Sequence, residues 1–380
     1  MAKNVYIAQT NCITPLGFDV DTNIAAISSG KTGISHVNDD KLMPQSFYGA
    51  VIDDKALDKA FVKISSGQNY TRLEKMMLLA LYPVFKSSGI LPDEKTALLV
   101  STTKGNVTSL NDDTGDKPRL DNLAKTIADF FGFVTEPIVV SNACVSGIMA
   151  VSVAKRLLQA GMYDHTFVVG GDEVSEFILS GFNSFQAMSD EPCKPYSANR
   201  TGVNLGEAAA AALVTINEKN AIAKITGDGS VNDANHISGP SRTGEGLVRS
   251  IQSALSEANI TSNKIDYISA HGTATPFNDE MEAIAFNRLD LQDVPVNSFK
   301  GYYGHTLGAS GLLEMVIGLE SMRRGELYTS AGYDAPGVSQ PINVITENQK
   351  KDIAVFLKTA SGFGGCNTAV LFEKTGNGRR

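Results

Sequence analysis

Residues 137–150, PIVVSNACVSGIMA, hold the strand, turn and helix start on which the fold prediction rests. A run of β-branched residues ending at Val140 is typical of a buried strand, and apolar residues at helical spacing begin at Met149. This pattern places Cys144 near a helix N-terminus, where free N–H groups and the helix dipole favour the thiolate. Cys144 is therefore a candidate nucleophile. The alternative interpretation is a small buried thiol in a strand–helix corner.

Strand and helix patterns alternate on both sides of this stretch. Buried strands are expected at residues 5–9, 96–101, 166–171, 208–216, 223–227, 265–270, 294–298 and 353–359. Helices are expected at residues 19–28, 70–88, 123–131, 247–259, 279–288 and 311–323, and an exposed loop at 103–121.

The order of these elements repeats along the chain. We therefore predict an α/β fold of two pseudo-duplicated halves, residues 1–243 and 244–380. Strands that alternate with helices imply largely parallel sheets covered by helices, so two stacked halves would give α/β/α/β/α layers. Reactive residues in such sheets collect at the carboxyl ends of the strands.

Composition narrows the function classes. The 380 residues carry a formal net charge of −8, which argues against nucleic-acid binding across a broad basic face. The four cysteines are far apart in sequence, which is typical of a reducing compartment rather than a disulfide scaffold. No signal-peptide pattern is seen, and the longest apolar runs are too short to cross a bilayer. A soluble, cytoplasmic protein is expected.

Three predicted strand ends carry a reactive side chain among Gly, Ser, Thr or Ala. They are SNAC with Cys144, AHGTATP with His271, and KGYYGHTLGASG with His305. Small residues let the backbone approach a ligand and direct N–H groups at it, so a shared catalytic site is favoured over two structural histidines. Zinc binding is the alternative for one Cys and two His, but no fourth ligand lies near in sequence.

These motifs resemble those of the β-ketoacyl-acyl carrier protein synthases, which belong to the thiolase-fold superfamily. The resemblance covers nearly the whole chain and rests on VYIAQTNCITPLGFDV, NACVSG, CKPYSANRTGVNLGEAAAAALV, HGTATPFND, FKGYYGHTLGASGLLE and GFGGCN. The chain departs from the family at Asn142, where Thr is usual, at Thr201 to Val203, and at Ala208. These departures and a short loop motivate the hypothesis of a specialised pathway, such as pigment or polyene synthesis.

The resemblance implies a decarboxylating Claisen condensation. Cys144 would take an acyl group from a carrier-protein thioester, and His271 and His305 would bind the malonyl thioester carbonyl and stabilise the enolate. It implies supporting roles near the second histidine for Lys300 and Glu314, for which a solvated ion pair is the alternative. The backbone N–H groups of Cys144 and Phe363 would form the oxyanion site. It further implies that Phe363 is a gatekeeper and that substrate is bound by Thr273, Thr275 and Gly364.

The same resemblance implies partners and no cofactor or metal, since the substrates are carried on the phosphopantetheine of acyl carrier protein. A homodimer, or a heterodimer with a related synthase-like subunit, is expected. Candidates for a basic patch that docks the acidic carrier protein, with solvated or internally paired charges as the alternative, are Arg72, Lys75, Lys194 and Arg200.

Two alternatives stay close to this family. A degradative thiolase would need a second catalytic cysteine, and Cys366, which follows two glycines, is interpreted as structural. A chain-length-factor-like subunit would lack the nucleophile, whereas this chain has Cys144 and both histidines.

Overall fold

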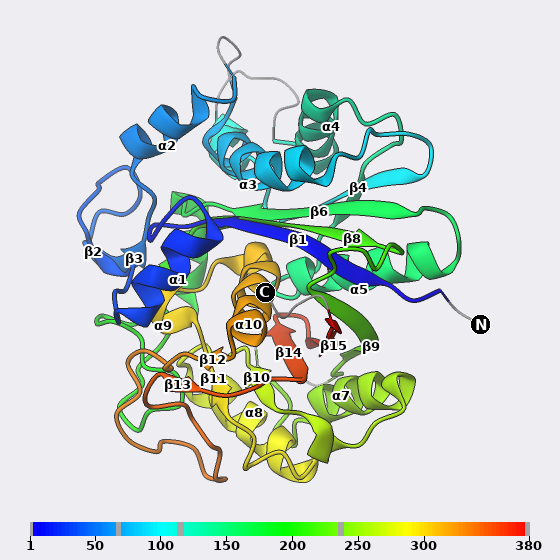
Figure 1. Cartoon of the computed structure of the whole chain (residues 1–380). Helices are drawn as coiled ribbons and strands as arrows, with labels where there is room; N and C mark the ends of the chain where they lie inside the picture. Colours follow the sequence, from blue (N-terminus) through cyan, green and yellow to red (C-terminus); the bar gives the residue numbers. More distant parts are fainter. Residues whose placement is uncertain (1–2, 66–69, 112–117, 235–238, 377–380) are drawn as a thin grey trace.

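Strands and helices alternate along the computed structural model, which describes residues 3–65, 70–111, 118–234 and 239–376 (Figure 1). The helices are α1 (Val20–Ser28), α2 (Asp54–Phe61), α3 (Arg72–Ser88), α4 (Leu120–Phe131), α5 (Ser146–Gln159), α6 (Glu176–Ser184), α7 (Glu245–Ala258), α8 (Pro276–Arg288), α9 (Lys300–Tyr303) and α10 (Ser310–Arg324), with short 3₁₀ turns η1 (Val107–Asn111), η2 (Ser262–Lys264) and η3 (Leu307–Ala309).

Ten strands form one sheet in the order β11-β10-β14-β15-β9-β1-β8-β6-β4-β5. In chain order these are β1 (Tyr6–Ile13), β4 (Thr96–Ser101), β5 (Ile138–Val140), β6 (His165–Asp172), β8 (Ala208–Thr215), β9 (Ala223–Asn232), β10 (Tyr267–Ser269), β11 (Val296–Asn297), β14 (Val355–Gly362) and β15 (Cys366–Lys374). Small sheets are formed by β2 (Ser35–Val37), β3 (Phe47–Ala50) and β7 (Leu205–Gly206), and by β12 (Glu326–Leu327) and β13 (Gln349–Lys350).

The sheet repeats one topology twice. From β5 through β4, β6 and β8 to β1 the pairings are parallel, parallel, antiparallel and antiparallel. From β11 through β10, β14 and β15 to β9 they follow the same sequence. The repeats join where β1 pairs with β9 over two residue pairs, Tyr6 with Lys224 and Ile7 with Ala223. The predicted pseudo-duplication is thus confirmed, and the boundary at residues 243/244 stays a prediction.

Five layers result from this duplication. Helices α3 and α4 cover the outer face of one repeat, and α7 and α8 cover that of the other, while α5 and α10 lie between the two (Figure 1). Strand β8 shows how sequence makes a layer: Ala210 and Ala212 face the central helices, whereas Ala211 and Leu213 face α3. A strand that is apolar on both faces is typical of a sheet buried on both sides.

Several elements escaped the sequence prediction. Helices α2 and α6 and the long strand β15 were not predicted, and β14 reaches Gly362 rather than ending at residue 359. The loop predicted to be exposed at 103–121 is partly buried where the structure describes it. It contains η1, and Asn106 is fully buried, with its side-chain amide donating to Glu74. Buried polar groups require such partners, and this one ties the loop to α3.

Candidate active site

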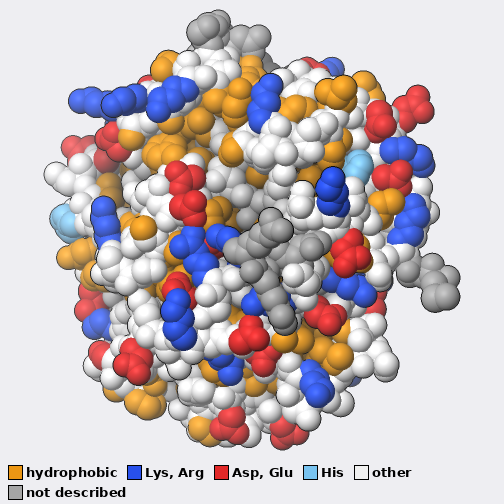
Figure 2. Space-filling view, viewed as in Figure 1, with side chains coloured by type: hydrophobic (Ala, Val, Ile, Leu, Met, Phe, Trp, Pro, Cys, Tyr) orange, Lys and Arg blue, Asp and Glu red, His pale blue; other side chains and the backbone are white. Residues whose placement is uncertain are grey.

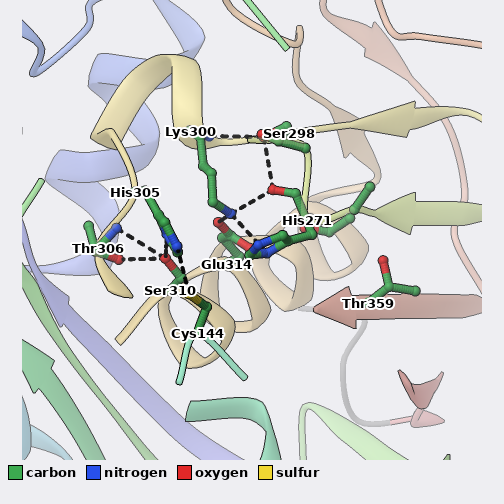
Figure 3. A network of polar contacts seen from close by, with 12 residues as sticks. Cys144, His271, Ser298, Lys300, His305, Thr306, Ser310, Glu314 and Thr359 are labelled. Atoms are coloured by element: carbon green, nitrogen blue, oxygen red, sulfur yellow. Dashed lines mark hydrogen bonds and ion pairs between the residues drawn. The ribbon is translucent and has the colours of Figure 1, made fainter. Parts of the chain in front are cut away.

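The three predicted reactive residues meet in one site (Figure 3). His305 Nε2 lies 3.0 Å from Cys144 Sγ, and the rings of His271 and His305 stand edge to face with centroids 5.3 Å apart. All three side chains are buried. Residues separated by up to 161 positions therefore form one cluster, as the strand-end argument predicted.

Two glycines bring the first turns of α5 and α10 together. A Cβ at Gly147 would lie 2.7 Å from the Gly308 carbonyl oxygen, and one at Gly311 would lie 2.8 Å from the Ile148 nitrogen. Backbones can approach this closely only where no side chain intervenes. The contact places Cys144, just before α5, beside His305, just before α10.

Local backbone geometry directs the cysteine into the site. Ala143 has a φ of 44°, a left-handed value that is unfavourable for alanine and turns the chain sharply before Cys144. Ser146 stabilises this turn, since its hydroxyl accepts from the Asn142 N–H at 2.8 Å and donates to the Ala143 carbonyl at 2.6 Å.

The charge state of Cys144 differs from the sequence expectation. Burial raises the pKa of its thiol to about 11, against the opposing effects of the Lys300 charge and a hydrogen bond from the Phe363 backbone. The predicted preference for thiolate at the helix start is therefore wrong for the resting site, because desolvation of the anion outweighs it. Cys144 is a thiol that must lose its proton when it reacts.

His305 is a neutral imidazole in contact with this thiol. Burial, followed by the nearby Lys300 charge, holds the pKa of His305 well below its usual range. Its Nδ1 lies 2.9 Å from the Ser310 hydroxyl, a group that both donates and accepts. Either neutral tautomer therefore fits this contact, and His305 can accept or return a proton at Nε2.

His271 is also neutral, but only one tautomer fits its surroundings. Burial, followed by the charge of Lys300, holds the pKa of His271 well below its usual range. Its Nδ1 lies 3.3 Å from the Lys300 ammonium nitrogen, which has protons to donate and no acceptor. Nδ1 must therefore be the acceptor, and the ring proton is on Nε2.

The pair Lys300 and Glu314 is buried rather than solvated. Their charged atoms lie 2.7 Å apart, and their side chains are 0% and 3% exposed. The pair was expected beside the second histidine, yet Lys300 donates to the His271 carbonyl at 2.6 Å and to its ring. The helical turn α9 points Lys300 back toward the end of β10, which explains the difference.

A carboxylate on α8 holds the backbone at His271. Glu282 accepts the N–H groups of His271 at 2.8 Å and Gly272 at 2.7 Å, and the Tyr196 hydroxyl at 3.0 Å. Glu282 was not predicted. Its spacing of eleven residues from His271, on the helix opened by Pro276, was the available signal.

The cluster opens into a cavity of about 560 Å³. Its lining includes Cys144, both histidines, and the predicted residues Thr273, Thr275 and Phe363, whereas Gly364 is exposed outside it. The hydroxyls of Thr273 and Thr275 are hydrogen-bonded to each other at 2.8 Å. The cavity is large enough for an extended organic chain.

Aromatic rings cover one side of this cavity. The Phe363 ring stacks on Phe182 with centroids 5.7 Å apart, and Phe185 meets it edge on at 5.5 Å. Phe182 also stands 6.3 Å from the His305 ring. Phe182 lies in α6 and Phe185 at its C-terminal end, and neither residue was predicted because this helix was not predicted. Two phenylalanines three positions apart were the available signal in the sequence.

Cys366 lines the same cavity. Its thiol donates to the Asn142 side-chain oxygen at 2.8 Å, and its pKa is raised by burial. Asn142 is the residue that stands where the family usually has Thr, so the unusual amide has a specific partner here.

Two candidate docking residues form ion pairs at the surface. Lys75 lies 2.7 Å from Asp58, and Lys194 lies 3.1 Å from Glu191, and both lysine side chains are 25% exposed. On the face shown in Figure 2, basic and acidic side chains are interspersed over most of the area. A docking role for this pair stays a prediction.

The two candidate arginines make mostly internal contacts. Arg72 pairs with Glu207 and Asp54, and the Arg200 side chain is 8% exposed and donates to the carbonyls of Ser197 and Pro276. These are the contacts of the internally paired alternative, and carrier docking by either arginine stays a prediction.

The described residues hold neither a metal-binding cluster nor a membrane-spanning helix. Residues 3–65, 70–111, 118–234 and 239–376 contain no group of three or more His, Cys, Asp or Glu side chains placed to hold a metal ion. No helix within the same ranges has both the length and the hydropathy to cross a membrane.

A cysteine and two histidines at the strand ends of a duplicated, five-layered α/β fold define the class as thiolase-fold condensing enzymes. Comparison with family models agrees. The model described as beta-ketoacyl synthase, N-terminal domain, matches residues 2–220, and the C-terminal domain model matches residues 222–334. The chain belongs to the beta-ketoacyl synthase family, which is a family of acyltransferases.

Similar proteins match nearly all of the chain or a large part of it. A putative mitochondrial 3-oxoacyl-(acyl-carrier-protein) synthase of Schizosaccharomyces pombe is 27% identical over 98% of this chain and 99% of its own length. The 3-oxoacyl-(acyl-carrier-protein) synthase 2 of Rhizobium meliloti is 34% identical over 62% of this chain, and the match spans 60% of that relative.

Solved structures show the same fold. The ketosynthase ApeO in complex with its chain length factor ApeC, from Xenorhabdus doucetiae, matches with a TM-score of 0.87 and 24% identity over 98% of both chains. The ishigamide ketosynthase/chain length factor matches with a TM-score of 0.88 and 20% identity over 99% of this chain and 100% of that one.

Proposed function

We propose that this protein catalyses the decarboxylating condensation of an acyl group, held on Cys144, with malonyl-acyl carrier protein. The observation that carries the proposal is the contact of 3.0 Å between Cys144 and His305, beside His271, in a cavity that a chain can enter. The product would be a β-ketoacyl-acyl carrier protein, in fatty-acid or polyketide synthesis.

The first step is acyl transfer. Cys144 Sγ attacks the carbonyl carbon of the acyl thioester, its proton passes to His305 Nε2, and the oxyanion accepts from the backbone N–H groups of Cys144 and Phe363. Collapse breaks the C–S bond of the thioester, and the carrier thiolate takes up the proton. Because the resting thiol has a raised pKa, a proton acceptor in contact with it is required.

The second step is decarboxylation and C–C bond formation. The malonyl thioester carbonyl accepts from the Nε2–H of His271 and of His305, so the electron pair left by CO₂ is held as an enolate. Neutral donors suit this task, since the charge appears only as CO₂ departs. The enolate carbon attacks the acyl-cysteine carbonyl and the Cys144 C–S bond breaks. The Cys144 thiolate that leaves takes up one proton from solvent, which restores the resting thiol.

Partners follow from this chemistry. We propose acyl carrier protein as the donor of both substrates, since a phosphopantetheine arm would reach the buried Cys144 through the cavity. A dimer, with a second copy or a related subunit, is proposed by analogy with the ketosynthase–chain length factor complexes among the structural neighbours. The free state of all four cysteines supports a reducing, cytoplasmic location.

The experiment compares the native chain with Cys144→Ala. Intact-protein mass after incubation with acyl-carrier thioesters of several chain lengths should show one acyl adduct on the native chain and none on the variant. Subsequent malonyl-carrier protein should remove the adduct and release CO₂. A native chain that stays unlabelled both alone and with a related subunit would contradict the proposal. A chain that is labelled only after addition of a related subunit would support the heterodimer.

A further inference from the structure

A second buried ammonium group, besides that of Lys300, lies near the site and takes no part in the chemistry described above. Lys358 sits in the middle of β14 and is 0% exposed. A charge in the buried part of a strand is costly unless it is fully paired. Its partners are therefore informative.

Lys358 is surrounded by oxygen atoms. Its Nζ donates to the carbonyls of Thr359 at 2.6 Å, Ser269 at 3.2 Å and Ala270 at 3.3 Å, and it lies 2.7 Å from Glu314 Oε2. Ser269 and Ala270 are the two residues that lead from β10 into His271. The Lys300 ammonium takes the next carbonyl, that of His271. Two lysines thus hold three consecutive carbonyl groups at the end of β10.

Glu314 links these lysines. Oε1 lies 2.7 Å from Lys300 and Oε2 lies 2.7 Å from Lys358, so one carboxylate is neutralised on both sides (Figure 3 shows Lys300, Glu314 and His271). Lys300 in turn contacts His271 Nδ1, the contact that fixes the ring proton on Nε2. A continuous path of ion pairs and hydrogen bonds connects Lys358 to the histidine.

We propose that Lys358 is a positioning residue for the two-histidine site, acting as a tethered cation that fixes Glu314, and through it Lys300 and the donor tautomer of His271. It touches no reacting atom. This inference rests on the proposed function, because the Nε2–H of His271 matters only if it binds a substrate carbonyl.

A purely structural pairing and a positioning role differ in their electrostatic consequence. The positive charge of Lys358 is one cause that lowers the pKa of His271, after burial, Lys300 and His305. Removing that charge should raise the pKa of His271, because its imidazolium form would be less disfavoured. The charged or titratable groups that face His271 are Cys144 before α5, Glu282 on α8, Lys300 on α9, His305 before η3, Glu314 on α10 and Lys358 on β14.

The test compares Lys358→Met with Lys155→Met. Lys155 is a matched control: it is 1% exposed and lies 2.7 Å from each of two carboxylates, Asp228 and Glu257, outside the active site. Each variant is first acylated on Cys144 and checked by intact mass. CO₂ release from malonyl-carrier protein is then measured in single turnovers from pH 5 to 9.

Lys358→Met should be acylated normally but release CO₂ about 10- to 100-fold more slowly. The acid limb of its pH profile, meaning the fall in rate toward low pH, should lie at higher pH than in the native chain. Lys155→Met should keep the native limb and rate. A native limb in folded Lys358→Met would overturn the inference, whereas a native chain that neither acylates nor decarboxylates would overturn the proposed function.

A folding defect would not end the test. If Lys358→Met does not fold, Glu314→Gln is compared with Glu314→Gln/Lys358→Met, in which neither charge of the pair is left alone. The limb of the double variant should lie at higher pH than that of Glu314→Gln. Coincident limbs would contradict the inference.

Discussion

The two repeats of the sheet share a backbone plan but hold their strand ends with opposite charges. At the end of β6, the buried carboxylate of Asp172 accepts from Thr102 Oγ1 at 2.8 Å, Thr103 N at 3.0 Å and Gly308 N at 2.7 Å. On β14, which has the equivalent place in the other repeat, Lys358 collects carbonyl oxygens.

This difference decides where the chemistry can lie. The anion gathers N–H groups around the loop after β4, which carries no reactive side chain. The cations gather carbonyl groups around the loop after β10, which carries His271. Each repeat also begins its central helix with a reactive residue, Cys144 before α5 and His305 before α10. The repeated topology thus gives two equivalent helix starts, one preceded by a cysteine and the other by the histidine that contacts it.

Replacing either histidine should have the largest effect on the reaction. His271→Ala and His305→Ala should each slow CO₂ release about 10²- to 10³-fold, because each removes one preorganised donor to the enolate. Only His305→Ala should also slow acylation, since His305 alone touches Cys144. Rapid-quench measurements of acyl-enzyme and CO₂ separate the two steps. Equal effects of both variants on acylation would contradict the assignment of roles.

Adding a side chain where the first turns of α5 and α10 touch should have the next largest effect, on the rate of acylation. In Gly147→Ala the new Cβ would approach the Gly308 carbonyl within 2.7 Å, so α5 must shift away from α10. Because misplacement of about 1 Å costs on the order of 10²-fold, acylation of Cys144 should fall by roughly that factor. Gly181→Ala, where a Cβ meets nothing within 4 Å, is the control and should acylate like the native chain.

The anionic end of β6 can be tested by stability. Asp172→Ala leaves several buried donors without an acceptor and should lower the free energy of unfolding by about 3 kcal/mol. Urea denaturation followed by circular dichroism measures the change. Asp121→Ala, which removes an exposed pair with Arg119, should leave the free energy of unfolding nearly unchanged. Equal losses would show that Asp172 does not hold the repeat together.

The smallest expected effect concerns the charge of Cys144 itself. With the pKa raised to about 11 by burial, the rate of alkylation by iodoacetamide should rise about tenfold per pH unit between pH 8 and 10. Subtracting the labelling of Cys144→Ala isolates this thiol from Cys366, which is also accessible from the cavity. A rate that levels off below pH 8 would indicate that the helix start, not burial, governs the thiol.

The sequence could predict the periodic part of this molecule. The alternation of buried strands and amphipathic helices, and the motifs around Cys144, His271 and His305, gave the layers and the central cluster. Short segments were harder: no element was predicted at the nine residues of α6, so Phe182 was missed.

The sequence pattern also could not predict how buried charges are paired or how burial shifts a pKa. Lys358 stands alone in a strand, and nothing local reveals that Glu314, forty-four positions earlier, neutralises it. For Cys144, the helix start was visible in sequence, whereas the depth of burial that reverses its effect depends on the packing of α5 against α10. The overlooked role of Lys358 and the wrong expectation for Cys144 have one origin, since both depend on contacts between residues far apart in the chain.

Strand β15 lies between β14 and β9 although it is the last strand of the described chain. Its partner strand β9 was made some 140 residues earlier, and the tight turn that leads into β15 carries Phe363 and the N–H group near Cys144. During translation, a ribosome must therefore have passed residue 374 before the sheet can close around the thiol. Until then the nascent chain holds Cys144 without the Phe363 N–H group beside it, so strand order makes the finished sheet a precondition for the chemistry proposed for this site.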